Sequence, residues 1–396
     1  MSGFESTKKE LEEWAERSKS EFWTMPSSVY TCPEWFEAEV EKIFNKEWLC
    51  IAHVSEVANK NDFLAIEVYD KPVLLTRDKK GDLRAFSNVC PHRSMILASG
   101  SGNKSVISCP YHAWSFQTDG KLRGAPFFTD EERERVKDVC LVEYQLEVWE
   151  GMIFINFDEN AEPIGPKLAE LLPKYQPYDA ANYKVVHRGS EHFECNWKVA
   201  VENFCESFHI FCVHPQSIEL VTSSASTEVW SGGSHFASSM VRTNEPEPEA
   251  YTARMPEALR EIHTVSSLFP VQGGAALTPS SAVWFFMLPT GPHTTQIHYI
   301  ISVYAGEGYE EIPQEMVEMG IAGINQAVSE DFAVTPQVQK GHAAGTNKSG
   351  PLHQPMEQAV WEFGHYVART VLDLDVMEEP NTSAWPPELV DSVAAE

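Results

Sequence analysis

Two short loops, each containing one cysteine and one histidine, constrain this chain more than any other feature. The first reads Cys90-Pro91-His92, and the second, Cys109-Pro-Tyr-His112, follows after residues 93–108. Each loop lies between short strand-like runs, so a small sheet can close both on one metal centre. Structural zinc sites usually keep like ligands together, as Cys-x-x-Cys and His-x3-His. The mixed loops favour a [2Fe–2S] cluster held by two cysteines and two histidines, with zinc and unrelated core thiols as alternatives.

Charge and hydropathy narrow the possible partners and the location. The chain carries 30 basic and 58 acidic residues, a net charge of -28 with histidine neutral. So acidic a surface repels phosphates, and we expect neither nucleic acid nor membrane as a partner. No apolar run approaches the roughly 18 residues of a spanning helix, and the N-terminus lacks the order of a signal peptide. The eight cysteines are too sparse for a disulfide framework, so the sequence predicts a cytoplasmic protein.

The first half of the chain predicts helices followed by a small β domain. Residues 1–48 contain two runs with apolar side chains at helical spacing, and we expect these helices to pack on the larger domain that follows the β domain. Residues 49–158 contain short β-branched and aromatic runs broken by Gly, Asp and Asn, which is typical of antiparallel strands. The Pro-rich residues 159–178 are expected to connect two domains.

The second half predicts a larger α+β domain over residues 179–370. Strand-like segments alternate there with helical segments near 198–212 and 310–340, which is the pattern of a sheet carrying helices. Residues 371–396 are acidic and contain proline, so we expect an exposed tail. The overall expectation is an α+β protein with a small antiparallel β domain and a larger second domain.

A carboxylate and histidine cluster marks the start of the larger domain. Glu202, Glu206 and His209 are spaced four and three residues apart, so they share one face of a helix. His214 lies about 140° further around an ideal helix, so the helix must be distorted or end there. Pro215 favours an ending. Two neutral imidazoles and one carboxylate would leave open positions on an Fe(II) ion for O2 and substrate.

The carboxylate that completes this ligand set must come from another part of the chain, and it is predicted to be Asp331. On a helical wheel that starts at Ile324, Asp331 lies about 20° away, within the apolar face formed by Ala327 and Val328, whereas Glu330 lies about 120° away. A charged side chain on a buried face is costly unless it is paired or binds metal. We therefore select Asp331 rather than Glu330 as the third ligand.

Two alternatives remain for the second cluster. Histidines at helical spacing are most often packed or surface residues. Glu206-x-x-His209 and Glu362-x-x-His365 are also two Glu-x-x-His pairs, the signature of a di-iron carboxylate bundle. Such a bundle needs four long inward-facing helices, and the strand-like, Gly- and Pro-rich residues 265–305 argue against it.

Both clusters together resemble the terminal oxygenase component of the Rieske-type non-haem iron oxygenases. NVCPHRSM and CPYHAWSF resemble the Rieske motif closely, and the resemblance spans roughly residues 30–365. It implies a Rieske domain followed by a helix-grip catalytic domain. It also implies a cluster held by Cys90, His92, Cys109 and His112, and a mononuclear iron held by His209, His214 and Asp331.

The resemblance further assigns Glu206 as the acid that bridges an iron-bound histidine to a cluster histidine of the neighbouring subunit. A homotrimer is implied, because electrons then cross a subunit boundary. The commoner family pattern has aspartate at this position. Glutamate occurs in members that act on quaternary ammonium compounds such as carnitine, betaines and choline.

The implied activity is hydroxylation of a small organic molecule with O2. The best match is a quaternary ammonium or N-methylated substrate, whose hydroxylation beside nitrogen leads to C–N cleavage or demethylation. The alternatives are an aromatic ring-hydroxylating mono- or dioxygenase and a Rieske electron-transfer protein without oxygenase activity. Gly100-Ser101-Gly102 lacks the context of a dinucleotide site, so NADH or NADPH would act through a separate flavin and iron–sulfur reductase.

Aromatic residues are the candidate walls of the substrate pocket. They could form a cation–π cage or stack on a flat ring, although ordinary core packing is the more frequent role of such residues. The candidates are Phe204, Phe208, Phe211, Trp230, Trp284, Phe285 and Phe286.

Overall fold

The computed structural model describes residues 3–18, 21–245, 247–346, 348–354 and 356–374, without the side chains of 228–231. Most of the predicted acidic tail lies outside these residues. The chain divides into two compact units, Lys46–Glu162 and Met1–Asn45 with Pro163–Glu396. No helix in the described ranges is long and apolar enough to cross a membrane.

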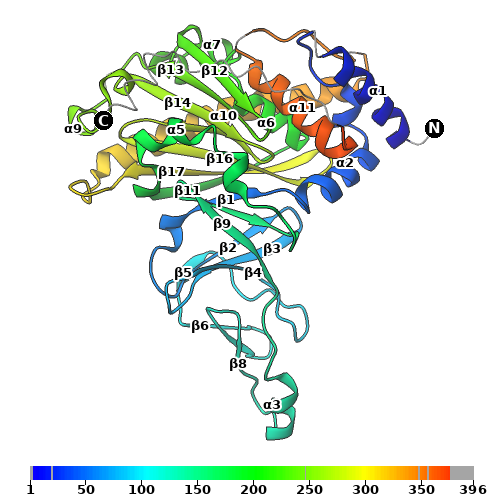
Figure 1. Ribbon diagram of the computed structural model, residues 1–396, viewed down its shortest axis with the longest axis vertical. Coiled ribbons are helices and arrows are strands. Elements are labelled where there is room, and N and C mark those ends of the chain that lie inside the picture. The colour runs from blue at the N-terminus through cyan, green and yellow to red at the C-terminus, as the bar shows by residue number, and fades with distance from the viewer. Residues whose placement is uncertain (1–2, 19–20, 246, 347, 355, 375–396) are drawn as a thin grey trace. The chain divides into compact units, whose positions relative to one another are not determined.

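The unit Lys46–Glu162 is antiparallel β, as predicted. Its larger sheet has the strand order β1-β10-β9-β4-β3-β2-β5, and its smaller sheet the order β6-β7-β8 (Figure 1). The strands are β1 (Leu49–His53), β2 (Asp62–Val68), β3 (Lys71–Arg77), β4 (Leu83–Ser87), β5 (Ser101–Asn103), β6 (Val106–Ser108), β7 (Ser115–Gln117), β8 (Leu122–Gly124), β9 (Glu143–Trp149) and β10 (Met152–Asn156), with one helix, α3 (Asp130–Val136). The first cysteine loop follows β4, and the second connects β6 to β7.

The other unit contains a seven-stranded antiparallel sheet in the order β11-β17-β16-β15-β14-β13-β12. Its strands are β11 (Tyr183–Phe193), β12 (Thr227–Gly233), β13 (Phe236–Arg242), β14 (Ile262–Leu268), β15 (Gln272–Leu277), β16 (Ser281–Gly291) and β17 (Thr294–Tyr304). From β12 to β17 each strand pairs with the next along the chain. Alternate side chains therefore face opposite sides of the sheet.

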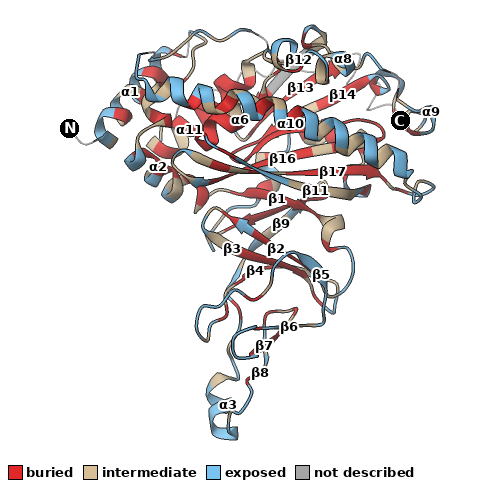
Figure 2. Ribbon diagram, turned by 180° about the vertical axis from the view of Figure 1, so that it is seen from behind, coloured by how far each residue is buried: buried red, intermediate tan, exposed pale blue. Residues whose placement is uncertain are grey.

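The helices of this unit are α1 (Gly3–Arg17), α2 (Pro33–Glu39), α4 (Ile164–Lys167), α5 (Leu172–Tyr175), α6 (Trp197–Cys205), α7 (Ile210–Val213), α8 (Ile218–Val221), α9 (Glu249–Thr252), α10 (Gln314–Ala343) and α11 (Gln358–Leu372). Helix α6 packs against β15 and β16, α10 against β11 and β17, and α11 against β12 and β13. In Figure 2 the outer side of α10 is exposed, while the strands behind it are largely buried. The α+β prediction is confirmed.

Residues 159–178, expected to connect two domains, contain side chains that are packed more tightly than that expectation required. Leu171, Tyr175 and Tyr178 are fully buried. The Tyr178 hydroxyl donates to the backbone oxygen of Ile262 over 2.9 Å, and the Tyr175 hydroxyl contacts Ser266. The aromatic side chains of this Pro-rich stretch therefore pack against β14. The residue-level domain boundaries stay a prediction.

A buried ion pair anchors helix α6. Lys198 Nζ lies 2.7 Å from Glu39 Oε1 on α2, and both side chains are fully buried. Trp35 Nε1 and Trp197 Nε1 donate to the same carboxylate over 2.8 and 2.9 Å. Buried charges persist only where partners satisfy them in this way. The network therefore anchors the first turn of α6, and the candidate site begins at the opposite end of this helix.

Candidate metal centres and substrate cavity

The two cysteine loops share one backbone design. The Ser94 N–H donates to the Cys90 oxygen over 2.9 Å, and the Ala113 N–H donates to the Cys109 oxygen over 3.0 Å. Ser94 and Ala113 both have a φ of 56°, in the left-handed region. The chain therefore reverses within each loop, and the residues between the cysteine and the left-handed position carry the histidine.

The four predicted donors of the loops come together at one end of the small sheet. Cys90 and Cys109 are 1% and 3% exposed. The rings of His92 and His112 lie 4.8 Å apart between centroids, and His92 stacks on Trp114 at 4.7 Å. Nδ1 of His92 is buried and has no hydrogen-bond partner. Two thiols and two imidazoles, one of them with an orphaned nitrogen, fit the ligand set of a mixed-ligand cluster.

The electrostatics of the loops also suit a cluster. Burial raises the pKa of the Cys90 thiol, whereas backbone N–H groups of His92 and Arg93 that point at its sulfur lower it. Such N–H groups stabilise sulfur that carries negative charge. Desolvation lowers the pKa of His112, and the neighbouring His92 and Arg93 lower it further. The lowered pKa favours the neutral ring, which is the form that binds a metal.

The predicted single helix over 198–212 is wrong in one respect. Helix α6 ends at Cys205, Glu206 is extended with φ -121° and ψ 167°, and α7 begins at Ile210 with His209 at its N-cap. Hydrogen bonds from the backbone N–H groups of Phe208 and His209 to Glu206 replace the helical bonds at the break. The predicted ending at His214 is correct, because His214 is the C-cap of α7.

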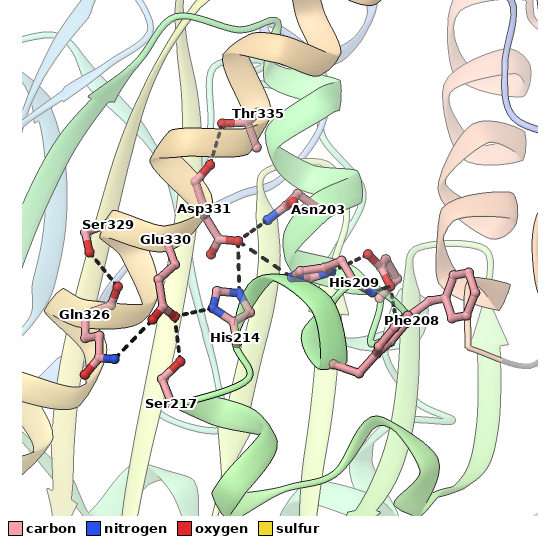
Figure 3. A network of polar contacts seen from close by, with 12 residues as sticks. Asn203, Phe208, His209, His214, Ser217, Gln326, Ser329, Glu330, Asp331 and Thr335 are labelled. Atoms are coloured by element: carbon pink, nitrogen blue, oxygen red, sulfur yellow. Dashed lines mark hydrogen bonds and ion pairs between the residues drawn. The ribbon is translucent and has the colours of Figure 1, made fainter.

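His209, His214 and Asp331 form the metal-capable cluster of the described residues, with ligand atoms within 4.8 Å of one another (Figure 3). Nε2 of His214 lies 3.1 Å from Asp331 Oδ1, and Nε2 of His209 lies 3.6 Å from the same oxygen. The side-chain amide of Asn203, which lies on α6, donates a hydrogen bond of 2.9 Å to this oxygen. The triad therefore fits the two-histidine, one-carboxylate set of a non-haem Fe(II) site.

The opposite nitrogens of both histidines contact further carboxylates. Nδ1 of His209 donates to Glu206 Oε1, and Nδ1 of His214 donates to Glu330 Oε2 over 2.7 Å. A carboxylate only accepts, so each contact places the ring proton on Nδ1 and leaves the Nε2 lone pair for a metal. Burial lowers the pKa of His214, but Asp331 and Glu330 raise it overall. A metal ion bound at Nε2 would take the place of the second proton, the one that gives the His214 ring its positive charge.

The sequence did not reveal the role of Glu330. The helical wheel correctly turns Glu330 away from the apolar face of α10, but its carboxylate contacts His214 and Ser217 rather than open solvent. Burial opposes its ionisation, whereas hydrogen bonds from Ser217, His214 and Gln326 lower its pKa. Glu330 therefore stays charged beside His214 and orients that imidazole.

We expect Glu330→Ala to weaken iron binding about tenfold, at the low end of the 10- to 100-fold losses typical of such outer carboxylates. The change frees the His214 ring to rotate and to change tautomer. Iron retained during competition with a chelator gives the affinity. Ser329→Ala is the matched control, because Ser329 bonds only the Gln326 backbone oxygen one turn away. Equal iron retention in both variants would contradict this role.

The triad lies at the wall of a cavity of about 540 Å³. Sheet residues of β13 to β17, helices α6 to α8 and one face of α10 line it. Many of these side chains are apolar, including Val265, Val283, Ile301, Met316 and Ile324. The cavity therefore has room for an organic molecule of modest size beside the triad.

Only some of the predicted aromatic walls border the cavity. Phe204 and Phe285 do, with ring centroids 4.7 Å apart. Trp284 and Phe286 are fully buried and, as neighbours of Phe285 on one strand, face the opposite side of the sheet. Phe208 and Phe211 are 37% and 54% exposed. The side chain of Trp230 lies outside the described residues.

Glu202, predicted on the same helical face as His209, and the second Glu-x-x-His pair, Glu362 and His365, lie elsewhere. Glu202 is buried against Tyr30, whose hydroxyl donates a hydrogen bond of 2.6 Å to the Glu202 carboxylate. Burial raises the pKa of Glu202 to about 8. His365 contacts Ser18 through Nε2 at 2.8 Å, and Glu362 accepts from Gln358. These groups do not join His209, so the described residues form no di-iron carboxylate site.

Comparison with protein families gives two matches. Residues 47–142 match the Rieske [2Fe-2S] domain, and residues 180–373 match the catalytic domain of the ring hydroxylating alpha subunit. The sequence is similar to the carnitine monooxygenase oxygenase subunit of Acinetobacter pittii, with 40% identity over 49% of this chain and 53% of that protein. The aligned part thus spans about half the length of these carnitine relatives.

Two further proteins match over most of the chain. The chloroplastic choline monooxygenase of Beta vulgaris is 28% identical over 88% of this chain and 77% of its own length. The quaternary ammonium Rieske monooxygenase CntA in complex with L-carnitine has a TM-score of 0.74 and 29% identity over 88% of this chain and 95% of its own. A further CntA structure is described in terms of carnitine oxidation and inter-subunit electron transfer.

Proposed function

Because this chain belongs to the Rieske-type non-haem iron oxygenases, we propose that it is the terminal oxygenase of a multicomponent system that hydroxylates a quaternary ammonium compound. One observation carries the proposal. Two histidines and an aspartate, oriented by outer carboxylates, lie at the wall of an organic-sized cavity in a chain that also carries a Rieske domain. The named relatives support the substrate class.

The proposal assigns a role to each site residue. Cys90, His92, Cys109 and His112 hold the [2Fe–2S] cluster, and His209, His214 and Asp331 hold the mononuclear iron. When bound, these centres supply stored electrons and the activation of O2. The reaction consumes O2, two electrons and two protons, and it places one oxygen atom in the substrate and the other in water.

The chain's own residues orient the ligands and exclude water. Glu206 and Glu330 hold each ring proton on Nδ1, and Asn203 holds Asp331. The aliphatic walls keep bulk water from the substrate carbon, which protects a reactive intermediate from side reactions. The faces of Phe204 and Phe285 and the negative charges of Glu206 and Asp331 favour a cationic head group at this end of the cavity.

The surface around Glu206 supports a homotrimer with electron transfer between subunits. Phe208 and Phe211 are exposed apolar residues next to Glu206, and exposed apolar patches commonly mark protein interfaces. His112 is also exposed, at the surface of its own unit. We propose that Glu206 links His209 to a cluster histidine of a partner subunit.

Electrons would come from a separate flavin and iron–sulfur reductase that uses NADH or NADPH. A cytoplasmic location completes the proposal, because the eight cysteines, all among the described residues, form no disulfide, as in a reducing compartment.

A substrate panel tests the function. The reconstituted oxygenase and a compatible reductase would be incubated with γ-butyrobetaine, L-carnitine, choline, glycine betaine and aromatic acids. We expect O2 uptake coupled to a hydroxylated or dealkylated product with quaternary ammonium compounds. Conversion of aromatic acids alone would favour ring hydroxylation, the second candidate, and absence of product from every compound would contradict oxygenase activity.

A further inference from the structure

The unit that carries the two cysteine loops has an open hollow of about 500 Å³ beside the second loop. Ala113, which follows His112 in the chain, borders this hollow together with strand β8 and one side of helix α3. In Figure 1, β8 and α3 lie at the end of this unit that is remote from β1. The proposed reaction gives this hollow no role so far, although it lies next to a proposed cluster ligand.

Phe127 is the distinctive side chain beside this hollow. It directly follows residues 124–126, which border the hollow, and its side chain is fully exposed, at 102%. Its φ of 64° lies in the left-handed region, which bulky residues rarely adopt. The two residues after it are held in place, because Phe128 packs on Trp114 and Thr129 caps helix α3. The backbone therefore holds an aromatic ring in solvent, as a binding anchor requires.

The hollow is basic in an otherwise acidic chain. Residues 88–127, which contain both cysteine loops, include four basic residues and one acidic residue, whereas the whole chain has a net charge of -28. Arg123, Arg133 and Lys137 border the hollow, and all three are exposed. Acidic neighbours on α3 pair with Arg133 and Lys137, but Arg123 forms no ion pair with any described residue. Exposed pairs contribute little, so all three cations are available to a partner.

Contacts between aromatic rings lead from this surface to the cysteine loops. Phe128, the neighbour of Phe127, meets Trp114 edge-on, with ring centroids 5.5 Å apart. Trp114 in turn stacks on His92, with centroids 4.7 Å apart and an angle of 5° between the planes. Trp114 is 6% exposed and packs in one core with both cysteines of the loops. A molecule docked at Phe127 is therefore connected to a proposed cluster ligand through packed side chains rather than through water.

The chemistry of this surface fits a transient protein complex. Cations around one aromatic anchor steer an acidic partner into place and hold it only briefly, as in the small interfaces of electron-transfer complexes. A permanent interface between copies of the chain would be larger and more apolar. Most of this chain repels an acidic partner, because its net charge is -28. The basic hollow is therefore the place where such a partner can approach the cysteine loops.

We propose that Phe127 and the cations of the hollow, Arg123, Arg133 and Lys137, form the docking site of the reductase that supplies electrons. The inference rests on the proposed function and deepens it. The matching face of the reductase carries carboxylates and an apolar contact for Phe127 around its own electron carrier. In each docking event that carrier is oxidised by one electron, and the cluster is reduced by one electron as one Fe(III) becomes Fe(II). Two such events supply the two electrons that the reaction consumes.

Binding of the reductase and reduction of the cluster test the site. The probe is a flavin and iron–sulfur reductase that supports turnover of the unmodified oxygenase with NADH. We expect Phe127→Ala and Arg123→Glu each to raise the Kd for this reductase about 10- to 100-fold, because each removes an anchor of the interface. The rate of cluster reduction at low reductase concentration, followed by visible absorption, should fall by the same factor. Added salt should weaken binding to the unmodified protein more than binding to Arg123→Glu.

Two variants of the same unit are matched controls. Val142→Ala removes an apolar side chain that is 65% exposed, and Lys80→Glu reverses an exposed charge. Neither residue borders the hollow. Both variants should bind the reductase as the unmodified protein does.

Chemical reduction separates docking from the later steps. After reduction with dithionite, mixing with O2 and a quaternary ammonium compound should give the same single-turnover rate in Phe127→Ala, Arg123→Glu and the unmodified enzyme, with the same oligomeric state. Unchanged reductase binding and cluster reduction in both variants would overturn the inference. Dissociation of the oligomer, or slower turnover after chemical reduction, would also overturn it and assign this surface to a second copy of the chain. Absence of product from the chemically reduced, unmodified enzyme would instead overturn the proposed function.

Discussion

Asp331→Ala should abolish turnover, with a loss of about 1,000-fold or more, and leave the Rieske cluster intact. The substitution removes the one carboxylate that both Nε2 atoms face, at 3.1 Å from His214 and 3.6 Å from His209. Two imidazoles alone hold Fe(II) far more weakly than the complete triad. Iron analysis should show the loss of mononuclear iron, and the visible spectrum should still show the cluster, whose proposed ligands lie in the other unit.

Glu318→Ala is the appropriate control for this experiment. Glu318 is an exposed carboxylate of the same helix, hydrogen-bonded to Gln314, and it does not border the cavity. The control should retain iron and activity. Retention of full iron content and turnover by Asp331→Ala would show that the third ligand has been misassigned, with Glu330 as the nearest alternative.

Glu206→Gln should slow electron delivery to the iron about 100-fold while both metal centres remain bound. The carboxylate accepts from His209 Nδ1 and from the backbone N–H groups at the break between α6 and α7. The amide keeps the shape but loses the charge, and an amide nitrogen facing the ring disfavours the Nδ1–H tautomer. Replacing the carboxylate that orients a catalytic histidine by an amide costs ~10⁴-fold in serine proteases.

Rapid mixing of the reduced enzyme with O2 and substrate measures this effect. Reoxidation of the cluster should be about 100-fold slower in Glu206→Gln, with unchanged iron content and unchanged cluster absorption. Glu219→Gln is a suitable comparison, because the Glu219 carboxylate accepts from Ser223 and Ser224, and Glu219 meets His214 only through a backbone hydrogen bond that the substitution keeps. Equal reoxidation rates in all three proteins would refute the bridging role of Glu206.

Local patterns were sufficient for the strongest predictions. The strand-like runs of residues 49–158 predicted the small antiparallel β unit, because alternating short runs and the turn residues between them are short-range features. The apolar wheel around Ile324 correctly separated buried Asp331, 3% exposed, from Glu330 on the outer side. Pro215 correctly indicated that a helix ends at His214.

Other features depended on residues far apart in the sequence. Glu330 contacts His214 across 116 positions, and the Glu247 and His263 pair forms between a loop and a strand. The sequence assigned no role to His263, and nothing local distinguishes it from a surface histidine. Phe285 borders the cavity whereas Trp284 does not, because the pleat of β16 turns adjacent side chains to opposite faces.

The amino-acid sequence by itself determined the two sets of candidate ligands and the α+β class, since both follow from spacing and hydrophobic periodicity. Only the tertiary structure decided which partners complete the sites. The contact of Glu330 with His214 and the contact of Glu247 with His263 each arise where separate elements meet. Hydrogen bonds act over about 3 Å, and which groups come that close is settled by packing rather than by local pattern.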